Sequence, residues 1–393
     1  MKNPPTQAED PAEKPATEPP NQKVVSIAQG YATARDHFRN GRNDEAAAIY
    51  RAILEADPNH LASMHNLALI IRDEGDLEKA VEVFNKILTI NPEFAEAYLS
   101  MGSTLNAAGR SDAAIDCFKK ALALRPDYVQ AHINLANCLS DREEFEPAIL
   151  HLRKAISLSP ENAAAHYNLG AILYFSGQLD DALSSSRQAI ALNPDFADAH
   201  LNLSVILLKQ GHLDDSLAAA EKALSLAPDS PGAHTAVANV LRDFGRFDEA
   251  ITHYRQAIDL KGDFEEAHSN LLMTLHYPPS TTSEDFLAAA TAWARPYNDA
   301  CPRPTFANKA DPDKRLRVGY VSADFSKHPV GFYLERILPF HKSQAVEYVG
   351  YCNSLKVDET TERLQQSSSL WRKITNLSDA ALAEQIRQDN IDI

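Results

Sequence analysis

The chain has 393 residues, of which 44% are hydrophobic, so it is long and apolar enough for more than one folding unit with a buried core. It contains 38 Lys and Arg against 54 Asp and Glu, and its net charge of −16 would repel phosphate backbones and anionic membrane surfaces. We therefore expect no nucleic-acid partner and no membrane partner.

The chain opens with a proline-rich, charged segment over residues 1–23, which lacks the apolar core of a signal peptide and which we predict to be a disordered tail. No later stretch has the roughly 18 uninterrupted apolar residues of a membrane span. The cysteines form no CxxC pair and no metal-ligand spacing, and this usage favours a reducing, cytoplasmic location. They are Cys117, Cys138, Cys301 and Cys352.

Proline recurs at a constant interval of 34 residues through most of the chain, at Pro58, Pro92, Pro126, Pro160, Pro194 and Pro228. Glycine recurs at the same interval, at Gly41, Gly75, Gly109, Gly177, Gly211 and Gly245, and Glu143 takes its place once. Small residues share the register, as at Ala68 and Ala80, and indicate close contact between two helices. Each unit is therefore predicted to be a pair of antiparallel helices, with the glycine in a left-handed turn and the proline after the second helix.

This pattern is identified as the tetratricopeptide repeat by its spacing and residue types. The predicted superhelix covers residues 24–276, and its final half unit runs from Glu265 to His276. The seven full units begin near Ile27, Leu61, Ala95, Val129, Ala163, Ala197 and Pro231. Since no unit could bury its apolar face alone, the units stack into an all-α solenoid whose inner groove is a binding surface.

Asparagine occupies one repeat position in five units, at Asn66, Asn134, Asn168, Asn202 and Asn270. Ser100 and Ala236 fill the two intervening places. Each asparagine alone would be explained as a tolerated polar residue on a solvated face. Five in register favour a further role, because a primary amide both donates to and accepts from a peptide backbone without regard to sequence. We predict that these residues bind an extended peptide.

Histidine forms a second series with the same interval, at His132, His166, His200, His234 and His268. These histidines occupy a helix-packing position, one in each unit, so that three of them could not converge on one metal ion. We predict half-buried packing residues with a hydrogen-bonded ring nitrogen, and no metal site.

The repeat pattern stops at residue 277, and residues 277–314 are predicted to form one helix and a linker. Ser283 is the expected N-cap of this helix, which ends near Asn298. From residue 315 strand patterns alternate with helical patterns, which indicates a parallel α/β sheet. The third strand is predicted at Asn390–Ile393, after helices near Glu359–Gln366 and Ser378–Gln388. No GxGxxG follows the first strand, so a dinucleotide site has little support.

Residues 316–329, LRVGYVSADFSKHP, closely resemble the start of the catalytic region of O-GlcNAc transferase, SPINDLY and their bacterial relatives. WRKI at residues 371–374 and LSDAALAEQIRQDNIDI at residues 377–393 are also similar to the bacterial members. The resemblance implies that residues 315–393 are the incomplete first α/β lobe of a GT-B glycosyltransferase, which moves a sugar from a nucleotide to Ser or Thr of proteins. In this family an asparagine ladder lines the superhelix, and the five asparagines match it.

His328 matches the active-site histidine of that family and lies just past the carboxyl end of the first strand, where open α/β sheets place their ligands. A histidine there could accept a hydroxyl proton at neutral pH. It could instead position substrate or cap the loop through hydrogen bonds. Asp324, at the same strand end, is predicted to orient the loop.

The chain ends inside the predicted third strand, which would leave an unfinished sheet with an exposed edge, so we expect a fragment or truncated product that is inactive alone. In the family a second lobe supplies most contacts to the nucleotide. The resemblance implies no cofactor and no metal, and a nucleotide-sugar donor, with UDP-GlcNAc preferred to GDP-fucose. The alternative is a non-catalytic repeat scaffold. Either protein would take protein or peptide partners in the groove, and the repeat surface also allows self-association.

Overall fold

The computed structural model describes residues 26–300, 314–341, 346–354 and 357–393. The chain forms two compact units, Met1–Pro296 and Tyr297–Ile393. The described part of the first unit is entirely helical, and the second combines helices with a small sheet. The predicted fold class, a helical repeat solenoid followed by part of an α/β lobe, is confirmed.

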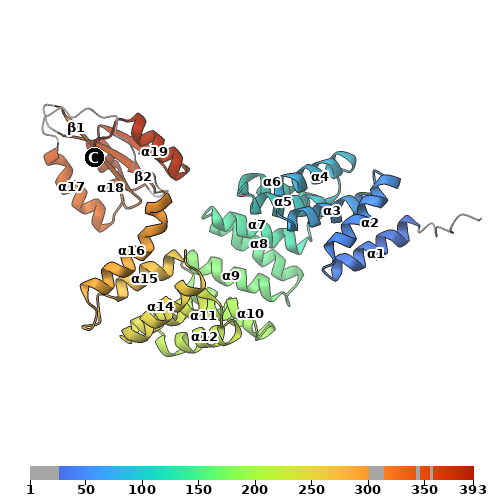
Figure 1. Ribbon diagram of the computed structural model, residues 1–393, viewed down its shortest axis with the longest axis horizontal. Coiled ribbons are helices and arrows are strands. Elements are labelled where there is room, and N and C mark those ends of the chain that lie inside the picture. The colour runs from blue at the N-terminus through green and yellow to red at the C-terminus, as the bar shows by residue number, and fades with distance from the viewer. Residues whose placement is uncertain (1–25, 301–313, 342–345, 355–356) are drawn as a thin grey trace, which may run out of the picture. The chain divides into compact units, whose positions relative to one another are not determined.

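The solenoid consists of antiparallel helix pairs that follow one another from blue to yellow in Figure 1. The first helices of the pairs are α1 (Ile27–Arg39), α3 (Leu61–Asp73), α5 (Ala95–Ala107), α7 (Val129–Asp141), α9 (Ala163–Phe175), α11 (Ala197–Lys209), α13 (Pro231–Asp243) and α15 (Glu265–Thr274). The second helices are α2 (Asn43–Ala56), α4 (Leu77–Ile90), α6 (Ser111–Leu124), α8 (Phe145–Leu158), α10 (Leu179–Leu192), α12 (Leu213–Leu226) and α14 (Phe247–Leu260). Each first helix begins where the repeat interval places it.

Successive first helices contact one another directly, from α3 with α5 through to α13 with α15. Within the described residues, the second helices of neighbouring pairs make no comparable contacts. The odd-numbered helices therefore follow the shorter path and line the concave side of the solenoid, whereas the even-numbered helices form its outer side. The candidate binding surface consequently belongs to the odd-numbered helices.

A longer helix, α16 (Ser283–Ala300), follows the last pair and continues past Pro296. The interval seen in the other units would start a second helix at residue 281, so α16 begins two residues late. Within the described ranges, no helix is both long enough and apolar enough to cross a membrane.

The second unit contains, in its described residues, a parallel sheet in the order β1–β2–β3. The strands are β1 (Leu316–Ser322), β2 (Val346–Cys352) and β3 (Leu370–Lys373), and the helices are α17 (Pro329–His341), α18 (Glu359–Ser367) and α19 (Asp379–Gln388). The predicted helices near residues 359–366 and 378–388 are confirmed. The predicted place of the third strand is wrong, because the strand beside β2 is Leu370–Lys373.

Residues 391–393 lie instead beside β1, at the other edge of the sheet. The backbone N–H of Asp392 donates to the carbonyl of Arg317 at 2.9 Å, and the N–H of Gly319 donates to the carbonyl of Ile393 at 2.9 Å. Asp389, at the end of α19, holds this segment in place: its carboxylate accepts from Tyr351 Oη at 2.8 Å and from Arg372 Nη2 at 2.7 Å. The Arg372 guanidinium lowers the pKa of Asp389, which keeps the carboxylate charged at neutral pH.

The turns after the first helices adopt the left-handed backbone conformation that the glycine series predicted. Gly75 has φ of 92°, and Glu143 has φ of 59° at the one place where glycine is missing. A side chain in this conformation brings Cβ too close to the backbone, at a cost of roughly 1–2 kcal/mol. Glu143 is therefore a strained residue in an otherwise regular series.

Replacing Glu143 by glycine should stabilise the solenoid by about 1 kcal/mol, because glycine adopts positive φ without this cost. Thermal unfolding followed by circular dichroism at 222 nm would record a higher midpoint. The matched control is Gly177→Glu, which places the same side chain in an equivalent turn and should lower the midpoint. A lower midpoint for Glu143→Gly would contradict this account of the turn.

Candidate functional site

The asparagine series lies on the concave side of the solenoid, where four of the five side chains reach the preceding repeat. Asn66 Nδ2 donates to Tyr31 Oη at 3.2 Å and Asn134 Nδ2 to Ser103 Oγ at 3.1 Å. In the later repeats, Asn202 Nδ2 lies 3.5 Å from the carbonyl of Tyr167, and Asn270 Nδ2 donates to Asn239 Oδ1 at 3.0 Å. The asparagines thus join consecutive first helices as well as facing the groove.

These bonds leave each amide with capacity for a ligand. A primary amide has two N–H groups and an oxygen with two lone pairs. Asn134 and Asn270 give one N–H to the neighbouring repeat. Asn66 Nδ2 also donates to Tyr50 Oη at 2.9 Å, and Asn202 Nδ2 to Ser186 Oγ at 3.3 Å, so that these two amides keep their oxygen for a ligand. The half-buried position restricts the rotation of the side chain, so the remaining groups are held in a fixed direction. Asn168 has no hydrogen bond from its side chain among the described residues, and it is the member of the series best suited to separate ligand binding from stability.

The histidine series confirms the prediction of packing residues with a hydrogen-bonded ring nitrogen. The Nε2 atoms donate to the carbonyls of Pro126, Pro160, Pro194, Pro228 and Gly262 at 3.0 to 3.1 Å. Each acceptor lies six residues earlier, just after the second helix of the preceding repeat. A carbonyl only accepts, so Nε2 carries the proton in every member of the series.

Two of these histidines pair with a second histidine on the following helix. His132 Nδ1 lies 2.9 Å from His151 Nδ1, and His234 Nδ1 lies 3.1 Å from His253 Nδ1. Burial, followed by the neighbouring imidazole, lowers the pKa of His151 and of His253. Among the described residues, no group of three or more His, Cys, Asp or Glu side chains lies close enough to hold a metal ion.

The cysteines of the described residues, Cys117, Cys138 and Cys352, are free and buried, while Cys301 lies outside them. Burial raises the pKa of Cys138 to about 11, so that its side chain is a neutral thiol at physiological pH. These side chains pack as small groups of the hydrophobic cores.

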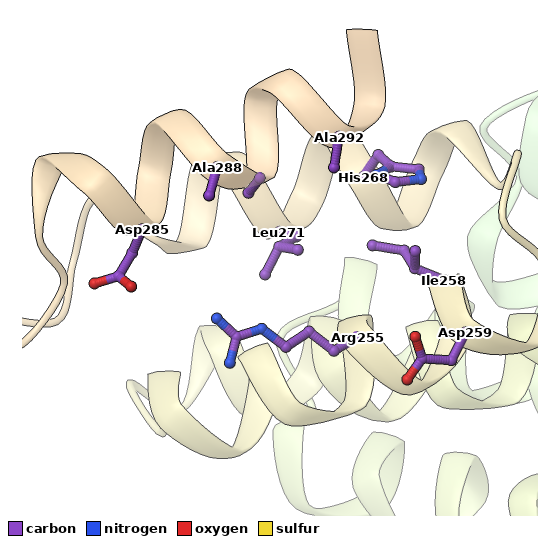
Figure 2. A pocket seen from close by; sticks show the side chains of 9 residues that line it. Arg255, Ile258, Asp259, His268, Leu271, Asp285, Ala288 and Ala292 are labelled. Atoms are coloured by element: carbon purple, nitrogen blue, oxygen red, sulfur yellow. The ribbon is translucent and has the colours of Figure 1, made fainter. Parts of the chain in front are cut away.

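A cavity of about 240 Å³ lies between α14, α15 and α16 (Figure 2). Alanines of α16 lie on one side of it, with His268 next to Ala292, and Arg255, Ile258 and Asp259 of α14 lie on the opposite side. The late start of α16 and its small side chains leave the space that a second helix would otherwise fill. The cavity is therefore explained by packing.

In the α/β unit, the loop between β1 and α17 carries the polar side chains that the sequence placed at the strand end. His328 immediately precedes Pro329, the first residue of α17. The backbone N–H of Val330 donates to His328 Nδ1 at 3.3 Å, and Asp324 Oδ2 lies 3.7 Å from the same nitrogen. Both side chains are about half exposed, at 47% and 49%. His328 therefore caps α17, and Asp324 stands beside it.

This arrangement bears on the two roles considered for His328. When Nδ1 accepts a backbone N–H, the proton of the neutral imidazole resides on Nε2. The outward-facing nitrogen is then a hydrogen-bond donor and has no lone pair for a substrate proton. In the described loop His328 therefore offers a donor, Nε2–H, beside the carboxyl end of β1.

The loop itself is fixed by three contacts. Phe325 is completely buried and packs against Trp371, with ring centroids 5.2 Å apart. The N–H of Lys327 donates to Asp358 Oδ2 at 2.6 Å, which ties the loop to the start of α18. Gly331 allows the first turn of α17 to approach the loop, because an added Cβ would lie 2.1 Å from the carbonyl oxygen of Ser326.

The two units together define a class of protein: a helical-repeat solenoid with amides along its concave side, followed in the chain by a parallel α/β unit with a polar loop after its first strand. Tetratricopeptide repeat models match residues 31–93, 139–184, 167–231 and 206–263, and a second such model matches residues 93–161. The glycosyl transferase family 41 model matches residues 301–393. The repeat models together cover residues 31–263, more than half of the chain, so the chain belongs to the tetratricopeptide-repeat proteins.

Curated relatives of this chain are named as probable peptide N-acetylglucosaminyltransferases. The probable UDP-N-acetylglucosamine–peptide N-acetylglucosaminyltransferase SPINDLY of Solanum lycopersicum is 29% identical over 129 residues, which are 32% of this chain and 14% of the relative. The corresponding SEC protein of Arabidopsis thaliana is 35% identical over 83 residues, 20% of this chain and 8% of the relative. The chain thus matches only a small part of the length of these relatives.

Among solved structures, the APC/C hetero-tetramer Cut9–Hcn1 is 18% identical with a TM-score of 0.55, over 65% of this chain and 50% of that one. This likeness shows the fold alone. An O-GlcNAc transferase mutant of Thermobaculum terrenum is 31% identical with a TM-score of 0.49, over 58% of this chain and 44% of that one.

Nitrogen-detected NMR of the chain labelled in histidine should find the His328 ring protonated on Nε2 and bare on Nδ1 near neutral pH, because Nδ1 accepts the N–H of Val330. The His328→Ala variant assigns the signal. A ring with its proton on Nδ1 would contradict the capping geometry.

The same capping bond makes a prediction about local stability. His328→Ala should raise the exchange rate of the Val330 amide, since loss of an N-cap costs about 1 kcal/mol. His328→Asn is the matched control, because asparagine is itself a good N-cap and should retain most of the protection.

Proposed function

We propose that this chain is part of a protein O-glycosyltransferase, which moves a sugar from a nucleotide donor to Ser or Thr of proteins. The observation that carries the proposal is the presence, in one chain, of a family 41 region and a repeat solenoid with amides on its concave side. The relatives named as peptide N-acetylglucosaminyltransferases support the same activity. The solenoid binds the acceptor, and the α/β unit contributes one wall of the catalytic site.

The acceptor binds in the concave groove as an extended segment, through its backbone. Stacked helices lie roughly 8–10 Å apart, and an extended peptide rises ~3.3 Å per residue, so that successive asparagines meet about every third residue of the ligand. The free N–H groups of Asn134 and Asn168 and the oxygen of Asn202 then pair with backbone groups of the acceptor. Binding of this kind accepts many sequences, as a transferase with many protein substrates requires.

UDP-N-acetylglucosamine is the donor that the names of the relatives support, and GDP-fucose is the second candidate. His328 lies at the carboxyl end of β1, where parallel sheets place ligands, and its Nε2–H would orient an oxygen of the acceptor or of the donor. The Val330 N–H would hold the imidazole in its orientation.

Replacing Asn134, Asn168 and Asn202 together by alanine should weaken the binding of a short fluorescein-labelled peptide of Ser, Thr and Gly at least about tenfold, because several hydrogen bonds of about 1 kcal/mol are lost. Fluorescence anisotropy measures the binding. The matched control removes three exposed amides from the outer helices, Asn85, Gln188 and Gln256, and should leave affinity unchanged.

The single variant Asn168→Ala separates binding from stability, because its side chain makes no bond to the preceding repeat among the described residues. This variant should bind the peptide more weakly, while its thermal midpoint stays that of the wild type. Unchanged affinity in both the single and the triple variant would exclude the asparagines as the binding groups.

Residues 1–393 alone should transfer no sugar, because rate in group transfer comes largely from holding donor and acceptor together and from groups that face the developing charge. The described α/β residues offer one polar loop to this task. Incubation with radiolabelled UDP-N-acetylglucosamine or GDP-fucose and a protein acceptor measures transfer. A chain extended through a second α/β lobe is the positive control. Transfer by residues 1–393 would contradict the prediction, and failure of the extended chain would favour a non-catalytic scaffold.

A further inference from the structure

The concave side of the solenoid changes character in the fifth and sixth repeats. Helix α9 contains no Asp, Glu, Lys or Arg, and its last residue, Phe175, is 66% exposed. One side of α9 is buried in the core, at Ala165, Leu169 and Leu173 among others, whereas Phe175 is a large apolar side chain left open to solvent. The ring of Phe175 contacts that of Tyr174, with centroids 5.4 Å apart. An aromatic pair therefore stands open at the end of this helix.

Phe175 faces the same groove as the asparagine series, and Tyr174 beside it is partly buried against the core. Phe175 follows Asn168 by seven residues, about two helical turns, so the two side chains lie on the same side of α9. On the next first helix, Val205 and Leu208 are half-buried and stand at the repeat positions of Ala171 and Tyr174. We refer to these five residues as the apolar subsite; they are Ala171, Tyr174, Phe175, Val205 and Leu208. The same positions in the flanking repeats are polar, being Asn137, Ser140, Asn239 and Arg242.

Opposite charges flank Phe175 along the groove. Its own repeat position is occupied by Asp141 in the preceding unit and by Lys209 in the following one, and both side chains are exposed. Neither makes an ion pair among the described residues. Since neighbouring first helices lie roughly 8–10 Å apart, an acid, an aromatic ring and a base follow one another at this spacing.

We propose that this part of the groove selects acceptor segments with an apolar side chain flanked by a basic residue about three positions to one side and an acidic residue about three positions to the other. The inference rests on the proposed binding of extended peptides in the groove. The apolar side chain covers Phe175 and Tyr174, the base faces Asp141, and the acid faces Lys209. The three-residue spacing follows from ~3.3 Å per residue in an extended chain.

The apolar subsite adds selectivity to a surface that otherwise reads only backbone. Covering exposed aromatic surface is favourable in proportion to the area removed from water. The flanking charges contribute less, because exposed ion pairs are weak, and they set the register of the segment more than its affinity.

The test uses the full chain and two short fluorescein-labelled peptides of Ser and Gly. Both carry Lys three positions before and Glu three positions after a central residue, which is Phe in one peptide and Ala in the other. Wild-type protein should bind the Phe peptide about tenfold more tightly than the Ala peptide, as expected for burial of part of an aromatic side chain.

Phe175→Asp should abolish this difference between the two peptides. The matched control is Leu150→Asp, which changes a side chain of equal exposure, 66%, on the outer helix α8. Because Phe175 is exposed at the helix end, both variants should keep the thermal midpoint of the wild type.

Equal binding of the two peptides by wild-type protein would overturn the apolar subsite while leaving backbone capture by the asparagines intact. Loss of the preference in Leu150→Asp as in Phe175→Asp would also overturn it. If neither peptide binds, both the apolar subsite and the proposed binding of extended peptides in the groove are wrong.

Discussion

Close contact between the two helices of each repeat is the constraint on which the solenoid depends. Ala68 and Ala80 are completely buried where α3 and α4 meet, and an added Cβ at Gly102 would lie 2.6 Å from the ring of Phe118. In the sixth repeat two buried serines, Ser204 and Ser216, meet at 3.1 Å and satisfy each other. This contact sets the rotation of every first helix, and so turns the asparagine position toward the concave side.

The two candidate sites present polar groups by the same physical means. One atom of the group is bonded within the fold, and this bond aims the remaining atom outward. Asn134 donates one N–H to Ser103, and His328 accepts the N–H of Val330. A group held in this way loses less conformational entropy when it meets a ligand. As a consequence, any substitution of these residues also removes a hydrogen bond of the fold, except at Asn168.

Much of this architecture could be predicted from the sequence, because the repeat interval, the turn conformations and the histidine environment follow from local spacing. The four-residue strand β3 was not predicted, since Trp, Arg and Lys in Leu370–Lys373 give no alternating pattern. The bonds of the asparagines could not be predicted either. Their partners lie in the preceding repeat. One partner is the backbone carbonyl of Tyr167, a group that every residue type carries, so the sequence does not reveal it. The proton position on His328 likewise depends on a loop geometry that spacing does not reveal.

The histidine-to-carbonyl bonds begin only at the fourth repeat, and this gives the solenoid unequal elasticity along its length. Gly30 and Met64 occupy the histidine position in the first two repeats, and their side chains have no hydrogen-bond donor. The contact between the first two repeats is consequently held by apolar packing and the bond from Asn66. Each contact between neighbouring repeats from α6–α7 onward has an additional hydrogen bond from a histidine. Under tension along its axis, the superhelix would extend first in its amino-terminal repeats. The repeats nearest the α/β unit in sequence would keep their pitch.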